Sequence, residues 1–230
     1  MILGSICMRG GSKGVKNKNI RPLLGRPLMN YTIDCAKQSE LLDDIAISSD
    51  SQEILAQGAK QGVQHLFSRE EHLATDEAPK WDVFKDLVLQ YESKTNNTVS
   101  FLVDLDVTVP RRLPKHIDGA IALMKEQEVE VVITAYEPER NPYFNMMELT
   151  PNGAQLVKQG SKPIVCRQEA PKVYGLTPAV YVIGRKAIFE LDHWSKAKCA
   201  LYPIPRELAV DIDAELDFKW VEFLMKENGK

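Results

Sequence analysis

The sequence predicts a three-layer α/β fold, in which a mostly parallel sheet is covered by helices on both faces. Short apolar runs of strand length alternate with amphipathic stretches of helical period along most of the chain. The chain has 230 residues, enough for one substantial domain that buries its core without disulfides. Its composition, 44% hydrophobic and 27% charged, is typical of a globular protein. We therefore expect residues 1–230 to form a single domain.

The apolar runs define the expected strands, and the amphipathic stretches between them define the expected helices. The strands are predicted at residues 2–7, 44–48, 64–67, 99–105, 129–136, 179–183 and 200–204. The helices are predicted at 29–38, 51–61, 81–91, 117–127 and 186–191, and from residue 214 to the C-terminus.

Two local features refine this pattern. Asp50, followed by Glu53 three residues later, predicts that Asp50 is the N-cap of the second helix and that Glu53 completes a capping box. Between residues 137 and 178 the strand–helix alternation stops, and the segment is rich in Pro, Asn and Gly. We expect this segment to be a β-hairpin-rich insertion that leaves the main sheet and exposes the aromatic side chains of Tyr143 and Phe144.

Charge and targeting signals exclude several classes of function. The net charge of −3 argues against nucleic acid as a partner, because binding to a phosphate backbone normally requires a basic excess. The N-terminal apolar run is too short for a signal peptide, and no run approaches a membrane span. The four cysteines are widely scattered and lack CxxC spacing, and the four histidines are equally dispersed. These features predict a soluble, cytoplasmic protein with reduced thiols.

The segment 9–14, RGGSKG, follows the first expected strand directly and is itself followed by Lys16, Lys18 and Asn19. Ligands of open α/β sheets bind at the carboxyl ends of strands. Glycines let backbone N–H groups approach phosphate oxygens, and Arg and Lys neutralise the phosphate charge. The spacing fits neither a P-loop nor a dinucleotide motif. The segment is therefore either a phosphate-binding loop of another kind or a solvated basic turn.

Asp211 and Asp213 flank an isoleucine, so an extended backbone would point both carboxylates to one side. Two convergent carboxylates suit Mg²⁺, which completes its coordination with water and substrate phosphates. Alternatively, Asp213 only caps the last helix.

The segment 103–112, VDLDVTVPRR, has carboxylates, a hydroxyl and arginines at the end of the central strand. These groups either contact substrate or metal, or shape a turn and face solvent.

Six segments occur in a fixed order along nearly the whole chain. They are Met8-Arg9-Gly10-Gly11-Ser12-Lys13-Gly14 with Lys18-Asn19; Pro27-Leu28 with Tyr31-Thr32-Ile33; Ile47-Ser48-Ser49-Asp50-Ser51; Arg69 with Leu73-Ala74-Thr75-Asp76 and Ala78; Asn141-Pro142-Tyr143-Phe144-Asn145; and Asp211-Ile212-Asp213-Ala214-Glu215-Leu216-Asp217. Together they resemble the CMP-N-acylneuraminate synthetase (acylneuraminate cytidylyltransferase) family, including its CMP-legionaminate synthetase-like members. One such motif is weak evidence for the family, whereas six motifs in the same order are specific to it.

The resemblance implies a Rossmann-like nucleotidyltransferase fold and a homodimer in which the insertion 137–178 reaches into the partner's site. It also implies CTP and an acidic sugar as substrates, and Mg²⁺ as cofactor. Catalysis would fall to Arg9, Lys18, Asp211 and Asp213, with the two aspartates as metal ligands. The nucleotide side would comprise Met8, Arg9, Gly10, Gly11, Ser12, Lys18, Asn19, Arg69 and Ala78, and the sugar side Asp106, Thr177 and Tyr181, with Arg167 reaching across from the other subunit.

The sugar side departs from the family pattern. Where the family often has LLQPTSPLR, Asp106 replaces a glutamine expected near the sugar. The usual NGAIYV begins here with Thr177, so a sugar-facing asparagine is lost, and Phe144 stands where some sialate enzymes have a lysine. The resemblance therefore supports the reaction class more strongly than sialic acid itself.

The implied reaction is attack by the anomeric hydroxyl of a nine-carbon 2-keto sugar acid on the α-phosphorus of CTP, with pyrophosphate leaving. The same reaction on legionaminic, pseudaminic or 3-deoxy-octulosonic acid is the nearest alternative. A non-catalytic CTP-binding regulatory protein is the alternative from another class, and the presence of Arg9, Lys18, Asp211 and Asp213 together argues against it.

Overall fold

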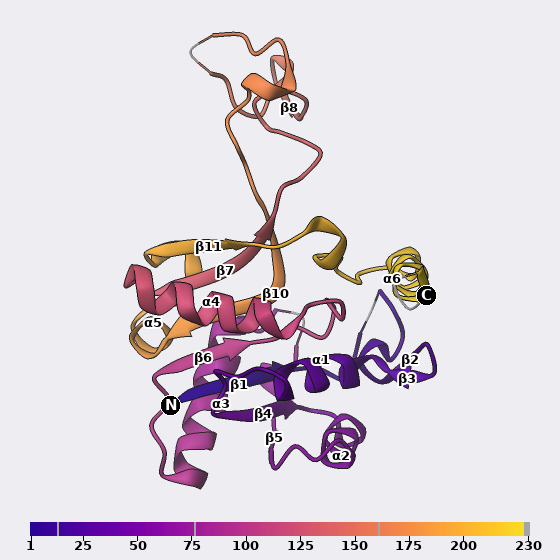
Figure 1. Cartoon of the computed structure of the whole chain (residues 1–230), viewed down its shortest axis with the longest axis vertical. Coiled ribbons are helices and arrows are strands. Elements are labelled where there is room, and N and C mark those ends of the chain that lie inside the picture. The colour runs from indigo at the N-terminus through magenta and orange to yellow at the C-terminus, as the bar shows by residue number, and fades with distance from the viewer. Residues whose placement is uncertain (13, 76, 161, 228–230) are drawn as a thin grey trace.

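A computed structural model describes residues 1–12, 14–75, 77–160 and 162–227 (Figure 1). Lys13 and Asp76, which belong to two of the motifs above, lie outside the described residues.

A seven-stranded sheet in the order β11-β7-β10-β6-β1-β4-β5 forms the centre of the molecule. β10 runs antiparallel to both of its neighbours, and every other pairing in the sheet is parallel. The mostly parallel sheet predicted from the sequence is therefore confirmed. The strands are β1 (Ile2–Cys7), β4 (Asp44–Ser49), β5 (His65–Ser68), β6 (Phe101–Asp104), β7 (Val131–Tyr136), β10 (Gly175–Gly184) and β11 (Cys199–Pro203).

Helices cover both faces of the sheet, as expected. One buried cluster joins apolar side chains of α1, α2, α4 and α6 to one face. The other joins α3 and α5 to the opposite face, with Trp81, Phe84, Leu87, Val88 and Tyr91 of α3 at helical spacing. The helices are α1 (Leu28–Lys37), α2 (Gln52–Lys60), α3 (Lys80–Thr95), α4 (Pro114–Gln127), α5 (Arg185–Glu190) and α6 (Glu215–Glu227), and a short ribbon joins β2 (Pro22–Leu23) to β3 (Arg26–Pro27).

The predicted cap of α2 is wrong by one residue. Ser51 is the N-cap, and its hydroxyl accepts a hydrogen bond from the backbone N–H of Ile54 at 3.4 Å. Ser51 has the extended backbone of an N-cap, so Asp50 lies one residue outside the helix. The Asp50 carboxylate instead accepts the N–H of Gly10 at 2.9 Å. It therefore links β4 to the loop that follows β1.

Several element boundaries differ from the prediction, and two of these differences have a structural reason. α4 begins at Pro114 rather than at residue 117, with proline in its first turn. The His116 ring accepts the N–H of Leu113 at 3.2 Å, a capping role that periodicity cannot reveal. β10 starts at Gly175, inside the predicted insertion, and its register shifts between Leu176 and Tyr181. Because of this irregularity, the first half of the strand lacks the regular alternation of period two from which strands are predicted.

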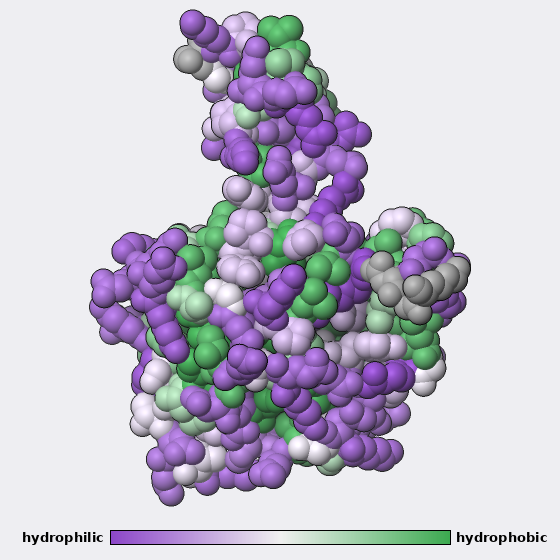
Figure 2. All heavy atoms as spheres, viewed as in Figure 1, coloured by the Kyte–Doolittle hydropathy of each residue, from purple (hydrophilic) through white to green (hydrophobic). Residues whose placement is uncertain are grey.

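The insertion leaves the sheet after β7 and returns at β10, as predicted. It carries one hairpin, β8 (Met147–Thr150) paired with β9 (Gly153–Leu156), and projects from the body of the molecule (Figures 1 and 2). Tyr143 and Phe144 are half-buried within it. No helix in the described part of the chain is long and apolar enough to cross a membrane.

Candidate active site

The loops that follow β1, β5 and β6 line a cleft of about 410 Å³ at the carboxyl edge of the sheet. Most of the residues predicted to bind nucleotide meet there, although they come from distant parts of the sequence. The predicted residues that line it are Met8, Arg9, Ser12, Lys18, Asn19, Arg69, Ala78, Asp106 and Asp213. The glycines 10 and 11 belong to the same loop but do not line this cleft.

Side chains from neighbouring elements hold the first loop in place. Asn19, in a short 3-10 helix (Lys18–Ile20), donates its side-chain amide to the carbonyl of Arg9 at 2.9 Å. A side chain at Gly14 would overlap the carbonyl oxygen of Asp213. A glycine is therefore needed for the loop to pack against the acidic segment near the C-terminus.

Lys18 connects that loop to the acidic segment directly. Its Nζ donates to the carbonyl of Ile212 at 2.5 Å and lies 3.9 Å from Asp213 Oδ1. Its side chain is only 14% exposed, so the ammonium group is held at the edge of the cleft rather than in solvent. Loop and acidic segment, about 200 residues apart in the chain, thus form one wall of the cleft.

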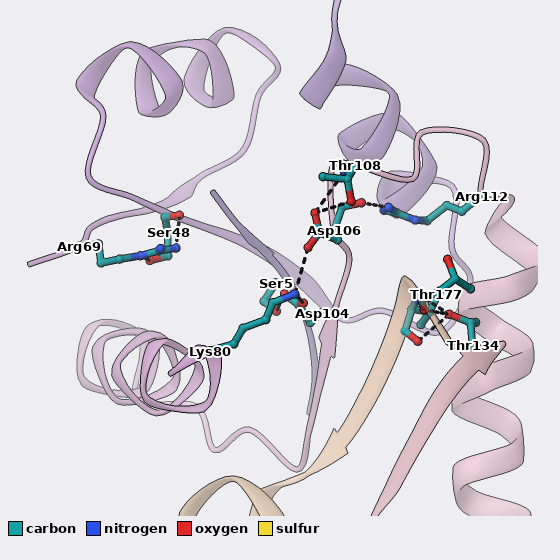
Figure 3. Close-up of polar contacts among 11 residues, drawn as sticks. Ser5, Ser48, Arg69, Lys80, Asp104, Asp106, Thr108, Arg112, Thr134 and Thr177 are labelled. Carbon is teal, nitrogen blue, oxygen red and sulfur yellow. Dashed lines mark hydrogen bonds and ion pairs between the residues drawn. The ribbon is translucent and has the colours of Figure 1, made fainter. Parts of the chain in front are cut away.

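On the opposite side of the loop, Arg69 follows β5 and is buried. Its Nε donates to the hydroxyl of Ser48 at 3.2 Å, and its Nη2 donates to the carbonyl of Ser48 at 3.0 Å (Figure 3). Met8 donates its backbone N–H to the same carbonyl. Ser48 at the end of β4 therefore sets the position of both predicted nucleotide-side residues.

Asp211 and Asp213 lie on either side of the fully buried Ile212, whose N–H donates to the carbonyl of Thr108 at 2.9 Å. Burial raises the pKa of Asp211, and the charges of Asp106 and Asp213 raise it further. Asp211 Oδ1 is buried and has no hydrogen-bond partner among the described residues. Asp213, by contrast, has a side chain that is 80% exposed.

The start of α6 is held by Asp217, whose Oδ2 accepts the N–H groups of Asp213 and Ala214 at 3.0 and 2.7 Å. Within the described part of the chain, the Asp213 carboxylate accepts no hydrogen bond from α6, which argues against its capping the helix. No group of three or more His, Cys, Asp or Glu among the described residues could hold a metal ion. A metal here would need substrate oxygens in addition to the two aspartates.

Two of the predicted sugar-side residues, Thr177 and Tyr181, lie on β10 beside β7, whereas the third, Asp106, lines the first cleft. Thr177 and Asp211 line a second cavity, of about 630 Å³, together with Tyr136 and Trp220. Thr177 is buried, and its hydroxyl donates to the carbonyl of Ala209 at 3.2 Å. Tyr181 is half-buried on β10, with its ring centroid 5.8 Å from Lys80 Nζ.

Arg167 lies in neither cavity. It sits in a 3-10 helix (Arg167–Glu169) of the insertion, where its Nη2 donates to the carbonyl of Pro138 at 3.3 Å. Within one subunit the structure therefore does not bring Arg167 to the other predicted residues.

Sequence reasoning missed Lys80 and underrated Asp104. Lys80 Nζ lies 2.8 Å from Asp104 Oδ2 and 3.1 Å from Asp106 Oδ2, at the centre of the site (Figure 3). Ser5 donates its hydroxyl to the other oxygen of Asp104 at 3.1 Å. Lys80 resembles an ordinary surface lysine at a helix start. The available signal was Asp104, because an aspartate inside an apolar strand requires a buried partner.

The fold and this cleft define the class of the protein: a Rossmann-like α/β nucleotidyltransferase. The chain belongs to the cytidylyltransferase family, whose sequence model matches residues 4–198.

Two relatives and one solved structure illustrate the similarity. The chain is 39% identical to post-translational flagellin modification protein B of Campylobacter coli over 228 residues, 99% of this chain and 96% of that protein. It is 40% identical to CMP-N,N'-diacetyllegionaminic acid synthase of Campylobacter jejuni over 224 residues, 97% and 94% of the two chains. A structure of CMP:2-keto-3-deoxy-manno-octonic acid synthetase complexed with CTP matches with a TM-score of 0.72 at 13% identity, covering 99% of both chains. At that identity the match supports the fold alone.

Proposed function

We propose that this enzyme joins CTP to a nine-carbon 2-keto sugar acid and releases pyrophosphate, giving a CMP-sugar. The observation that carries the proposal is the cleft itself, in which Arg9, Lys18 and Arg69 gather beside Asp213 at the carboxyl ends of the strands. Three cationic side chains suit a triphosphate, and family membership supports CTP as its source.

The chain's own residues contribute positioning and charge. Phosphoryl-group transfer depends chiefly on alignment and electrostatic stabilisation, with little covalent participation by the protein. Arg9 and Lys18 are proposed to bind the β- and γ-phosphates and to offset charge on the departing pyrophosphate. Arg69, fixed on Ser48, is proposed to bind on the nucleotide side, where Ala78 leaves room for the ligand.

Mg²⁺ is the proposed cofactor, with Asp211 and Asp213 as its protein ligands. The residues fit the ion, since Asp211 offers a buried carboxylate oxygen without a donor and Asp213 offers an exposed carboxylate in the cleft. Mg²⁺ is commonly held by one or two carboxylates together with substrate phosphates. When bound, it would neutralise phosphate charge.

Among the possible sugar acids, an N-acylated legionaminic acid is the first candidate and N-acylneuraminic acid the second. The similarity to CMP-N,N'-diacetyllegionaminic acid synthase supports the first. Asp106 and Thr177, which depart from the pattern expected for sialic acid, support it as well. Pseudaminic and 3-deoxy-octulosonic acids are further members of the same substrate class.

The reaction is tested by measuring pyrophosphate release with Mg²⁺, each of the four nucleoside triphosphates and a panel of 2-keto sugar acids. We expect CTP to be turned over at least about tenfold faster than UTP, ATP or GTP, because a site that hydrogen-bonds a base rejects bases lacking those groups. A CTP rate within about twofold of the UTP rate would contradict the assignment. No pyrophosphate with any sugar acid would contradict it altogether.

The enzyme is proposed to act as a homodimer formed through the insertion 137–178. Supporting this, the insertion exposes Met147 by 59%, Leu149 by 90% and Val165 by 83%, an apolar surface that an interface would cover. Hydrophobic residues are visible on the far end of the insertion in Figure 2.

Sedimentation is expected to show a dimer at micromolar concentration, and Leu149→Asp is expected to shift the protein toward monomer, because a charge would be buried in the interface. Leu89→Asp is the matched control: Leu89 lies on α3 of the body and is 54% exposed, so the change should leave the assembly intact. A parent protein that sediments as a monomer would contradict the proposal.

The proposed location is the cytoplasm. In support, Cys7, Cys35, Cys166 and Cys199 are all free thiols. Unpaired cysteines, two of them exposed, suit a reducing compartment.

A further inference from the structure

An ion-pair cluster of three residues, Lys80, Asp104 and Asp106, lies at the middle of the carboxyl edge of the sheet (Figure 3). Lys80 is the first residue of α3, and its side chain crosses from that helix to the end of β6. The Asp104 side chain is 1% exposed, that of Asp106 is 25% exposed, and that of Lys80 is 45% exposed. The cluster thus runs from the sheet interior into the cleft, which Lys80 and Asp106 both line.

Charge decides what this lysine can bind. One ammonium group serves two carboxylates, so the cluster carries a net charge of about −1. Burial alone would lower the pKa of Lys80, but the two aspartates outweigh it and the pKa lies above its ordinary value. An ammonium group already held by two carboxylates is a poor site for a phosphate. Lys80 therefore acts on its partners rather than on the triphosphate.

Asp106 is the partner that reaches the ligand space. Its Oδ1 accepts the N–H and the hydroxyl of Thr108 at 3.2 and 3.0 Å, and its Oδ2 accepts from Lys80. Burial opposes ionisation, but Lys80 and Thr108 outweigh it and hold the pKa of Asp106 below its ordinary value. The cleft is therefore lined by an ionised carboxylate in a fixed orientation, which can only accept hydrogen bonds.

The position of β6 indicates which substrate this carboxylate would contact. On one side of it in the sheet lie β1, β4 and β5, whose ends carry Arg9 and Arg69. On the other side lies β10, which carries Thr177 and Tyr181, and Tyr181 pairs directly with Asp104. The backbone N–H of Asp106 donates to the carbonyl of Pro178 at 3.3 Å, which holds the backbone of Asp106 beside β10. The cluster marks the boundary between the nucleotide side and the side of the second substrate.

We propose that Lys80 is a positioning residue for sugar recognition: its bridge to Asp104 and Asp106 holds the Asp106 carboxylate as a fixed acceptor for a hydroxyl or N-acyl N–H of the sugar acid. This inference rests on the proposed function. It assigns no phosphate contact to Lys80. It also links Asp106 to Lys80. A carboxylate beside the buried Asp104 needs a cationic partner, whereas a glutamine at position 106 would not.

The test is steady-state kinetics on the full chain, with CTP and N,N'-diacetyllegionaminic acid, or N-acetylneuraminic acid if it is turned over faster. Lys80→Met is expected to raise KM for the sugar acid about tenfold and to change KM for CTP less than about twofold. Asp106→Asn should give the same pattern. Both substitutions remove the same interaction, so the double variant Lys80→Met with Asp106→Asn should have a KM for the sugar acid close to that of either single variant. If the two residues acted independently, the double variant would raise this KM about 100-fold.

Three further variants distinguish the loss of a positioning role from a general loss of folding or activity. Lys80→Arg keeps a cation within reach of both carboxylates and should restore most of the sugar affinity. Lys80→Met with Asp104→Asn removes the unpaired buried charge, so it should fold like the parent and still show the raised sugar KM. Lys85→Met is the matched control on the same helix, since Lys85 pairs only with Asp82 at 3.6 Å among the described residues, and it should alter neither KM.

The outcomes separate this inference from the function on which it rests. A parent that releases no pyrophosphate with any sugar acid refutes the proposed function and this inference with it. If the parent is active but Lys80→Met raises KM for CTP as much as KM for the sugar acid, Lys80 is a nucleotide contact. That result overturns this inference and leaves the proposed function standing. Unchanged KM values in Lys80→Met and in Asp106→Asn also overturn it.

Discussion

Asp213→Asn is expected to lower kcat by roughly 10³-fold while the protein stays folded, because a metal contribution of about 4 kcal/mol to the transition state corresponds to that factor. The substitution conserves size and removes one charged oxygen ligand, on which Mg²⁺ depends. The Asp213 side chain is 80% exposed, so the change leaves no cavity. The helix start is unaffected, because Asp217 accepts the N–H groups of Asp213 and Ala214.

Asp217→Asn is the matched control, four residues further along the same segment. It should weaken the first turn of α6 slightly and leave turnover near the parent value, since asparagine also accepts backbone N–H groups. Asp211→Asn should resemble Asp213→Asn in its loss of turnover. Titration of both metal-site variants with Mg²⁺ should show a raised requirement for the ion. Asp213→Asn working at half the parent rate or better at ordinary Mg²⁺ would defeat the proposed metal site.

Arg9→Ala is expected to reduce kcat/KM by roughly 10²-fold or more, because losing a charge contact of ~3 kcal/mol in the transition state has that effect. Arg9 lines the cleft from the loop after β1, and its carbonyl is anchored by Asn19. The loop backbone should therefore keep its shape when the guanidinium group is removed. The loss should appear in the rate of pyrophosphate release at low CTP.

Arg26→Ala provides the comparison for Arg9→Ala. Arg26 forms an exposed ion pair with Asp34 on α1 and stacks over Tyr31, outside the cleft. Surface pairs of this kind contribute little to stability, so the variant should be almost as active as the parent. If Arg9→Ala were as active as Arg26→Ala, the loop would have no part in the active site.

The layered architecture could be predicted from the sequence because strands and helices impose different periods on apolar residues. β1 matched its apolar run residue for residue, and the helix predicted at 81–91 lies within α3. The gathering of the proposed nucleotide-side residues in one cleft could be predicted for a related reason. A glycine-rich loop must directly follow a strand to reach a phosphate, so its residues are contiguous and recognisable. Met8, Arg9, Ser12, Lys18 and Asn19 all line the cleft.

Features that depend on contacts between distant segments could not be predicted from local sequence patterns. The cap of α2 was assigned to Asp50 because aspartate and serine are both good caps, and only the contact with Gly10 shows why Asp50 is used elsewhere. Tyr143 and Phe144 were expected to be exposed on the insertion. They are half-buried there, and Met147, Leu149 and Val165 form the exposed apolar surface instead.

Lys80 shows most clearly what tertiary structure adds. In the sequence it stands 24 and 26 residues from Asp104 and Asp106, with no spacing that links them. The sheet order places β6 in the centre, and the packing of α3 brings Lys80 Nζ within 2.8 Å of Asp104. Periodicity and contiguous motifs are properties of the local chain, so they determine the elements and the proposed phosphate-binding loop. An ion pair across elements depends on where strands pair and helices pack, and only the folded chain decides that.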